Sequence, residues 1–567
     1  MIIENVIAAF GVVFELETLA LMVVGVAAGL ITGAIPGFTI TMAVVLTLPF
    51  TFGMPPVQGL ATMIGVFVGG LSGGLMAGIL TGIPGTPSSV ATTFDGFPMA
   101  RKGKPGLALG IGVWSSFCGG IFSAILLMTL APQLARIGLE FGPWDYFSLV
   151  LFALTICASL AGKDMLKGLI AGAFGVFVAT IGEDDINGVA RFDFGIDELR
   201  QGFAFLPVLV GLFAFSQLLN DVLDKEKARK PLMPKGATAV KVEHRKAIGE
   251  VLKHWPVVVR SSLIGVFTGI LPGAGGSVAN ILAYDQAKKA SKYPEKFGTG
   301  HIEGIIAPES SNNATEGGAL IIMMALGIPG DVVTAVMLGA LLIHDVVPSP
   351  SFITDEPVLA YSIFLAFFFA HFIMVALQAV CLRVFVLVTR MPMYVLAAVI
   401  FAYCAIGIFA LNNVVFDLWT LLIFGIIGFT MKNLGFPLAP MILGVVLGHI
   451  AELNLSRAVA SSDDLTLFLT RPWSMFFLII ASFSAAFPKF QADRGKKKWT
   501  LFYLPLACMA VSLPLMLMGG VVRPVASMAV FALGGILLWR RAQGGWRLKA
   551  AAESVTQDGQ DPPTPGQ

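Results

Sequence analysis

The stretch GILPGAGGSVAN, Gly269–Asn280, interrupts an otherwise apolar segment of this 567-residue chain. Glycine weakens a helix through its backbone freedom, and proline does so because it has no N–H donor. Three further stretches show a similar pattern: GAIPGFTIT (Gly33–Thr41), GIPGTPSS (Gly82–Ser89) and GIPGDVVT (Gly327–Thr334). A single kinked helix would not explain four such interruptions, so the sequence predicts helices that are broken within apolar surroundings.

The composition around these breaks is that of a polytopic membrane protein. Hydrophobic residues make up 56% of the chain and charged residues 13%, and the mean hydropathy is +0.83. A soluble domain would carry roughly 25% charged residues. The net charge of +2 does not point to nucleic acid, and the five cysteines lie in apolar segments without metal-ligand spacing. We therefore expect an all-α polytopic membrane protein with about 11 to 14 membrane segments.

The distribution of Lys and Arg predicts how the chain is oriented, because basic loops stay in the cytoplasm. Basic loops such as Arg101–Lys104 and Lys225–Lys253 are placed inside, and the acidic loop Asp345–Glu356 outside. The segment 256–284 has basic stretches on both sides, so we expect it to enter the membrane, turn at Pro272–Gly276 and return as a re-entrant hairpin. An ordinary span with a glycine kink is the alternative. Non-helical backbone at membrane depth is tolerated only inside protein or beside a wet cavity.

The breaks also occur in similar pairs. GLITGAIPGFTITMAV (Gly29–Val44) is similar to GVFTGILPGAGGSVAN (Gly265–Asn280), and SGGLMAGILTGIPGTPSSVAT (Ser72–Thr92) is similar to GGALIIMMALGIPGDVVTAVM (Gly317–Met337). The same order in both halves indicates an internal duplication. The two breaks of the first half lead to a basic loop and the two breaks of the second half lead to an acidic one, so the two repeats are expected to have inverted topology.

These patterns divide the chain into five parts. They are a first inverted repeat (1–222), a basic cytoplasmic linker (223–255), a second inverted repeat (256–452), additional C-terminal membrane helices (453–541) and a polar tail (542–567). The tail is polar and rich in Pro and Gly, which is typical of disorder, and we place it in the cytoplasm.

Broken helices between inverted repeats are the architecture of secondary transporters, whose sites lie near the membrane midplane. Half-helix N-termini suit an anion such as a carboxylate, and freed carbonyls with nearby hydroxyls suit Na⁺. The predicted substrate-binding residues are Pro36, Gly37, Thr39, Gly85, Thr86, Ser88, Pro272, Gly273, Ala274, Gly275, Gly276, Ser277, Pro329 and Gly330. The predicted cation-binding residues are Ser277, Asn312, Asn313, Asp331 and Thr334. The alternative is that these Ser and Thr residues only cap helices.

One polar stretch lies between apolar regions: APESSNNATEGGAL, Ala307–Leu320. It contains Glu309 and Glu316 beside the two asparagines, and an ionisable group at membrane depth is a candidate functional site. A surface loop is the alternative interpretation. Asp95, which borders the basic loop that begins at Arg101, is expected to form a turn or a cap instead.

Taken together, the breaks and the polar stretch resemble the large permease subunit of the tripartite tricarboxylate transporter family (TctA-type). The motifs are the G-x-x-P-G breaks at Gly33 and Gly269, the two GIPG breaks, DGFPMARKG (Asp95–Gly103) and PESSNNATEGG (Pro308–Gly318). Six segments in the family's order are specific, and the similarity covers roughly residues 15–490. The two apolar segments after Lys498 depart from the family pattern and predict an appended hairpin.

The resemblance implies a bacterial inner-membrane importer of di- or tricarboxylates such as citrate. It implies two partners, a small four-helix membrane subunit and a periplasmic solute-binding protein. Uptake would be driven by a Na⁺ or H⁺ gradient rather than by ATP, in agreement with the lack of a Walker A motif in the sequence. No enzyme activity and no cofactor are expected beyond a coupling Na⁺.

Two alternatives come from other classes of protein. GLSG (Gly70–Gly73) matches the motif of intramembrane serine proteases, with Ser72 as the nucleophile and His371 or His449 as a base. Glycines around a serine also favour close helix packing, however, and the duplication favours a transporter over a protease. A channel is the second alternative, because re-entrant Gly/Pro hairpins also build selectivity filters.

Overall fold

A computed structural model of the chain describes residues 2–35, 38–160, 164–184, 188–223, 240–344, 346, 348–388, 393–520, 522–543 and 546. The predicted site residues Pro36 and Gly37, residues 224–239 of the linker and nearly all of the tail over 542–567 lie outside these residues. The described chain is helical except for short connections and one antiparallel pair of strands, β1 (Gly182–Glu183) with β2 (Ala190–Arg191).

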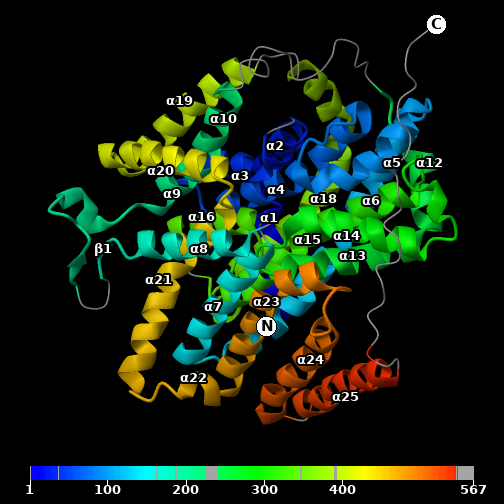
Figure 1. The fold of residues 1–567 in the computed structure, drawn as a ribbon. Coiled ribbons are helices and arrows are strands. Elements are labelled where there is room, and N and C mark those ends of the chain that lie inside the picture. The colour runs from blue at the N-terminus through cyan, green and yellow to red at the C-terminus, as the bar shows by residue number, and fades with distance from the viewer. Residues whose placement is uncertain are drawn as a thin grey trace, which may run out of the picture. The chain divides into compact units, whose positions relative to one another are not determined.

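The chain forms two compact units (Figure 1). The first contains residues 1–141 and 160–453, and the second contains residues 142–159 and 454–567. All four breaks lie in the first unit.

The first half of the large unit is built from a helical hairpin, a long buried helix and a helix that restarts after a break. Its helices are α1 (Ile2–Val13), α2 (Leu16–Gly33), α3 (Ile40–Thr51), α4 (Pro56–Thr81), η1 (Pro87–Ser89), α5 (Val90–Arg101) and α6 (Pro105–Gly138). Proline at the first helical position starts both α4 and α6, where its missing N–H costs no hydrogen bond.

The second half repeats this arrangement. Its helices are α12 (His244–Lys253), α13 (Trp255–Ile270), α14 (Gly275–Ala290), η4 (Pro294–Lys296), α15 (Glu303–Leu326), α16 (Val332–Ile343), α17 (Phe352–Asp355) and α18 (Pro357–Val388). In both halves a glycine with positive φ ends the long buried helix before the GIPG segment: Gly82 after α4 and Gly327 after α15. This left-handed conformation suits glycine because a β-carbon would be strained there.

Tight glycine contacts hold the paired helices together in both halves. A β-carbon on Gly29 would lie 2.3 Å from the carbonyl oxygen of Val66, and one on Gly33 would lie 2.0 Å from that of Gly70. The corresponding positions in the second half behave alike. A β-carbon on Gly265 would lie 2.2 Å from the Ser311 carbonyl oxygen, and one on Gly269 would lie 2.2 Å from that of Thr315. The duplication seen in the sequence is therefore also a duplication of backbone contacts.

These contacts show that α13 and α14 form a hairpin. Along α13 the partners on α15 advance from Ser311 to Thr315, so the two helices run in the same direction. Along α14 the partners run backwards. Gly276 faces Asn312, whereas Tyr284 bonds to Asp95, the residue that also contacts Gly304 near the start of α15. The predicted hairpin is confirmed and the kinked single helix is wrong, while its position in a membrane stays a prediction.

A long helix of each half packs against the other half. The α6 helix of the first half packs on α15, and α18 of the second half packs on α4. Figure 1 shows α13, α14 and α15 side by side next to α6. The large unit is therefore held together across the two repeats.

The remaining elements complete the two units. They are α7 (Pro143–Leu160), α8 (Met165–Ala179), η2 (Asp197–Gln201), α9 (Phe205–Val210), η3 (Gly211–Phe215), α10 (Ser216–Leu223), α19 (Met393–Asn412), α20 (Val415–Asn433), α21 (Leu438–Ser461), α22 (Leu467–Thr470), α23 (Pro472–Asp493), α24 (Thr500–Leu517) and α25 (Val522–Gln543). Within the second unit Asp145 of α7 is bound by the Arg471 guanidinium at 2.7 Å, and α24 packs on α25 as the predicted hairpin.

Ten helices of the described chain are long and apolar enough to cross a membrane, and seven shorter apolar helices accompany them. The expected all-α polytopic membrane fold is confirmed. The opposite orientation of the two repeats in the membrane stays a prediction.

Candidate functional site

The polar stretch of the second half is a helix in the interior of the large unit. Every residue of α15 after Glu303 is buried, and Glu309, Asn312, Asn313 and Glu316 have no exposed surface. Four polar residues remain in the core because α6, α13 and α14 pack around the helix. The surface-loop interpretation is therefore wrong.

Breaks from both halves meet beside Asn312. A β-carbon on Gly276, in the first turn of α14, would lie 2.8 Å from Asn312 Oδ1 and 3.0 Å from the β-carbon of Ser88 in η1. Leu71 of α4 lies on the same side, at 3.6 Å. Asn280 strengthens the junction, since its Oδ1 accepts a 2.7 Å hydrogen bond from the Ala91 N–H in the first turn of α5. The breaks at Gly82–Ser89 and Gly269–Asn280, one from each half, are thus close to each other beside Asn312.

The hydroxyls that follow the GIPG motifs close two matching capping boxes. Thr86 pairs with Ser89 before α5, and Asp331 pairs with Thr334 before α16. Asp331 Oδ1 accepts from both the N–H and the hydroxyl of Thr334, each at 2.8 Å. Capping accounts for the presence of these residues. The ion-binding role that the sequence suggested for Asp331 and Thr334 stays a prediction.

Several of the glycines predicted to bind substrate lie where the breaks pack against neighbouring segments. The N–H of Gly85 donates to the Gly74 carbonyl at 3.3 Å, and the N–H of Gly273 donates to the Gly330 carbonyl at 2.9 Å. A β-carbon on Gly330 would lie 2.3 Å from the Gly269 carbonyl oxygen. The break at Gly269–Asn280 and the break at Gly327–Thr334 are therefore in contact.

The other residues predicted to bind substrate differ in how far they are buried. Thr39 caps α3 by accepting from the Met42 N–H at 3.2 Å. Pro272, Ala274 and Pro329 are buried, whereas Gly273, Gly275, Gly276 and Ser277 are half-buried. The first turn of α14 is thus more exposed than Pro272, Ala274 and Pro329, and its N–H groups carry the partial positive charge of a helix N-terminus.

Acceptors without donors gather on α15. Within the described residues, Asn312 Oδ1, Asn313 Oδ1 and both carboxylate oxygens of Glu316 have no hydrogen-bond partner, although all are buried. The amide groups point the other way: Asn312 Nδ2 donates to the Leu71 carbonyl at 3.4 Å, and Asn313 Nδ2 donates to Ser72 Oγ at 2.9 Å. Buried acceptors without a donor cost free energy, so they suit a bound cation or proton.

Glu309 is the contrasting case on the same helix. Its Oε1 accepts from the Thr92 hydroxyl at 2.5 Å, and its Oε2 accepts from the Ser116 hydroxyl at 2.8 Å. Both carboxylate oxygens therefore have donors, one from α5 and one from α6. Glu309 links α15 to the first half.

Ser72 is not arranged as a protease nucleophile. Its hydroxyl accepts a bond from Asn313, and no histidine bonds to it in the part of the chain that the structure describes. Nδ1 of His371 instead contacts the Phe367 carbonyl at 2.8 Å. Ser72 is buried where α4 crosses α15, which agrees with a packing role.

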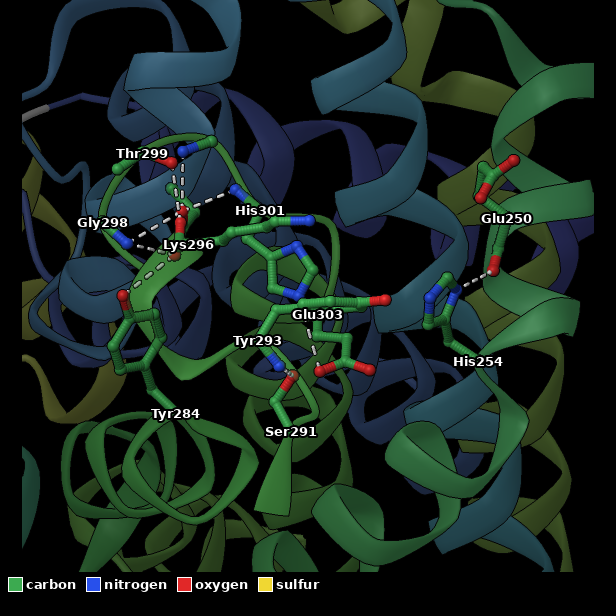
Figure 2. Close-up of polar contacts among 12 residues, drawn as sticks. Glu250, His254, Tyr284, Ser291, Tyr293, Lys296, Gly298, Thr299, His301 and Glu303 are labelled. Carbon is green, nitrogen blue, oxygen red and sulfur yellow. Dashed lines mark hydrogen bonds and ion pairs between the residues drawn. The ribbon is translucent and has the colours of Figure 1, made fainter. Parts of the chain in front are cut away.

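Asp95 has a role that the sequence did not indicate. Its carboxylate is buried and accepts the N–H groups of Gly298, Gly300 and His301 at 2.6–3.0 Å, together with the Tyr284 hydroxyl at 2.9 Å. In Figure 2 the dashed lines from the Tyr284 hydroxyl and from the backbone nitrogens of Gly298 and His301 converge on one carboxylate. The expected turn or cap role applies to a distant segment, because Asp95 accepts backbone N–H groups of the connection between α14 and α15. Only tertiary structure brings these donors to it.

Comparisons with known proteins agree with this architecture. Residues 19–443 match the model of the tripartite tricarboxylate transporter TctA family. A protein of Agrobacterium vitis described as an uncharacterised 52.8 kDa protein in the TAR-I ttuC′ 3′ region is 33% identical over 461 residues, or 81% of this chain and 90% of that protein. A second, described as an uncharacterised protein in the TAR-II ttuC′ 3′ region, is 33% identical over 41% of this chain and 98% of its own length.

No solved structure matches the chain. The family match covers both pairs of breaks, the Asp95 segment and the whole of α15. Members of this family are the large membrane subunits of transporters that also use a small membrane protein and a periplasmic binding protein. The chain is thus a multi-pass membrane protein that belongs to the TctA family of tripartite tricarboxylate transporters.

Proposed function

We propose that this chain is the permease of a binding-protein-dependent secondary transporter that imports citrate-like di- or tricarboxylates across the bacterial inner membrane. The observation that carries the proposal is the junction of Gly276, Ser88 and Asn312, where breaks from both repeats converge. The first turn of α14 would bind a substrate carboxylate through its free N–H groups. The hydroxyls of Ser88 and Ser277 lie in the same region and would add hydrogen bonds.

A cation gradient, of Na⁺ or H⁺, would drive uptake. Asn312 Oδ1 is a buried acceptor without a donor that faces the substrate junction. An amide oxygen is a suitable ligand for Na⁺, and a cation there would also neutralise part of the substrate's charge. Cation and carboxylate would therefore stabilise each other's binding, which is the linkage that a symporter needs.

The repeated contacts support alternating access as the mechanism. Each repeat builds the same hairpin against the same kind of long helix, and the two repeats meet at the site. If the repeats are inverted in the membrane, an exchange of their conformations would open the site first to one side and then to the other. The binding protein would deliver the substrate from the periplasm, and the C-terminal tail would lie in the cytoplasm.

Uptake of radiolabelled carboxylates into proteoliposomes tests the proposal. The vesicles contain this chain with its small membrane subunit, and the binding protein and the cation gradient are each supplied or left out. We expect accumulation that saturates and that needs both the binding protein and a gradient. Saturable accumulation without the binding protein would contradict the tripartite mechanism. Flux that does not saturate would favour a channel.

A further inference from the structure

Glu316 of α15 and His371 of α18 form a buried pair that the substrate junction does not include. Neither side chain has any exposed surface, and Glu316 Oε2 lies 3.6 Å from His371 Nε2. That distance is longer than a hydrogen bond. Nε2 and both carboxylate oxygens have no hydrogen-bond partner within the described residues.

The bond on the other side of the ring determines which nitrogen carries the proton. His371 Nδ1 lies 2.8 Å from the carbonyl oxygen of Phe367. A carbonyl only accepts hydrogen bonds, so Nδ1 must be the protonated nitrogen. In a neutral ring Nε2 is then a bare acceptor, and it faces a carboxylate oxygen that is also an acceptor. Two acceptors that face each other without any exposed surface are unfavourable unless a proton or a cation lies between them.

The surroundings favour a proton over a metal cation. A β-carbon on Gly120 of α6 would lie 1.9 Å from Nε2, so the ring occupies the space that the glycine leaves open. A metal cation prefers several oxygen ligands. Among the described residues, no three His, Cys, Asp or Glu side chains come together as they would around a metal ion. A proton needs only the two atoms already present.

Few other charges act on this pair. Asp331, at the start of α16, is the further acidic group that interacts electrostatically with Glu316. The α4 and α16 spans contain no titratable side chain. The other titratable residues on the elements packed against α15 and α18 are Glu4, Glu17, Asp95, Arg101, Cys118, Arg136, Arg260, Tyr284, Asp285, Lys288, Lys289, Glu303, Glu309, Asp355, Tyr361, Cys381 and Arg383. Glu309, on the same helix as Glu316, is occupied by Thr92 and Ser116.

We propose that Glu316 and His371 together bind one exchangeable proton and that this proton couples transport to a proton gradient. The pair would take the proton from the outer side, hold it between Oε2 and Nε2 during the conformational change, and release it to the cytoplasm. One positive charge crosses with each cycle of the pair, and no bond other than the two to hydrogen is made or broken. This inference rests on the proposed function and assigns H⁺ as the coupling ion.

The test compares gradient-driven accumulation with substrate exchange in the reconstituted complex. Glu316→Gln keeps the size of the side chain and supplies an N–H to His371 Nε2, so the pair is satisfied without a proton. We expect this variant to keep exchange of labelled for unlabelled substrate but to lose accumulation driven by an acidic exterior. Glu316→Asp should recover part of that accumulation, because it restores a carboxylate. In the wild type, uptake should fall as the external pH rises.

Glu309→Gln is the matched control, since it removes the other buried carboxylate of α15. This variant should keep accumulation driven by the pH gradient. Loss of that accumulation in Glu309→Gln would overturn the assignment to the Glu316–His371 pair. Unchanged gradient-driven accumulation in Glu316→Gln would overturn it as well. Wild-type accumulation that responds only to Na⁺ at constant pH would do the same.

A second measurement separates this inference from the proposed function. Infrared difference spectra of the purified complex during a pH jump report carboxyl protonation without any transport. We expect a protonated-carboxyl band that is missing in Glu316→Gln and present in Glu309→Gln. An identical band in Glu316→Gln would contradict the proton site even if the substrate were misidentified. A complex that shows the expected difference but transports no carboxylate would leave the site standing and contradict only the substrate assignment.

Discussion

The helices α4 and α15 occupy the same place in the two repeats, but their side chains differ. Both pack against a parallel helix through glycine contacts, and both end at a glycine before a GIPG segment. Counting back from that segment, Asn312 corresponds to Phe67 and Glu316 to Leu71. The duplication has therefore kept the packing of the backbone, while buried glutamate and asparagine side chains lie on α15 and not on α4.

The largest effect is expected where the two repeats agree. Gly33→Ala and Gly269→Ala would each place a β-carbon within 2.2 Å of a carbonyl oxygen of the neighbouring helix. Backbone atoms cannot move away cheaply, so each variant should lose about 1–3 kcal/mol or more of stability. Thermal unfolding of the detergent-purified protein measures this. Gly11→Ala, where nothing lies within 4 Å, is the control and should behave like the wild type. A stable Gly33→Ala with an unstable Gly269→Ala would break the equivalence of the repeats.

The second largest effect should differ between α15 and α4. Asn312→Ala removes the unpaired acceptor at the junction and only a weak 3.4 Å bond to Leu71. We expect uptake to be abolished while stability falls by about 1 kcal/mol. Phe67→Leu, at the corresponding position of α4, should keep uptake, because it changes only packing. Uptake in proteoliposomes and the yield of folded protein give the two readouts. Normal uptake by Asn312→Ala would remove this residue from the site.

A smaller effect concerns a contact present in one repeat only. The buried carboxylate of Asp95 accepts hydrogen bonds from three N–H groups and one hydroxyl. Asp95→Asn replaces it with a neutral amide, which weakens these hydrogen bonds. A hydrogen bond to a charged group contributes about 1.5–3 kcal/mol, so a loss of that order is expected. The connection between α14 and α15 should also become cleavable by protease. Unchanged cleavage would show that Asp95 does not hold this connection.

The smallest effects should be equal in the two repeats. Thr86→Ala and Asp331→Ala each remove the first residue of a capping box. Each should cost about 1 kcal/mol, as the loss of an N-cap side chain usually does. Chemical denaturation compares the two variants directly. A much larger loss of uptake than of stability in Asp331→Ala would indicate that this carboxylate also binds the cation.

Local sequence features were sufficient to predict the breaks, because glycine and proline act on their own segment. The pairing of the breaks and the hairpin at Pro272–Gly276 followed from the repeated motif and the charges around it. The sequence could not predict that α15 is buried along its length, because burial depends on α6 and α13, which lie far away in sequence. The partners of Asp95 and the approach of Glu316 to His371 are likewise contacts between distant segments.

Substrate protection of a cysteine placed at the junction measures whether a carboxylate binds at the break. Ser277→Cys is made in a chain whose five native cysteines are replaced by alanine or serine, and the rate of modification by a charged thiol reagent is measured with and without the transported carboxylate. Ser461→Cys, on the exposed end of α21, serves as the control. We expect the carboxylate to slow modification of Ser277→Cys and to leave Ser461→Cys unaffected. Equal rates with and without a carboxylate that this variant still transports would contradict a substrate site at the break.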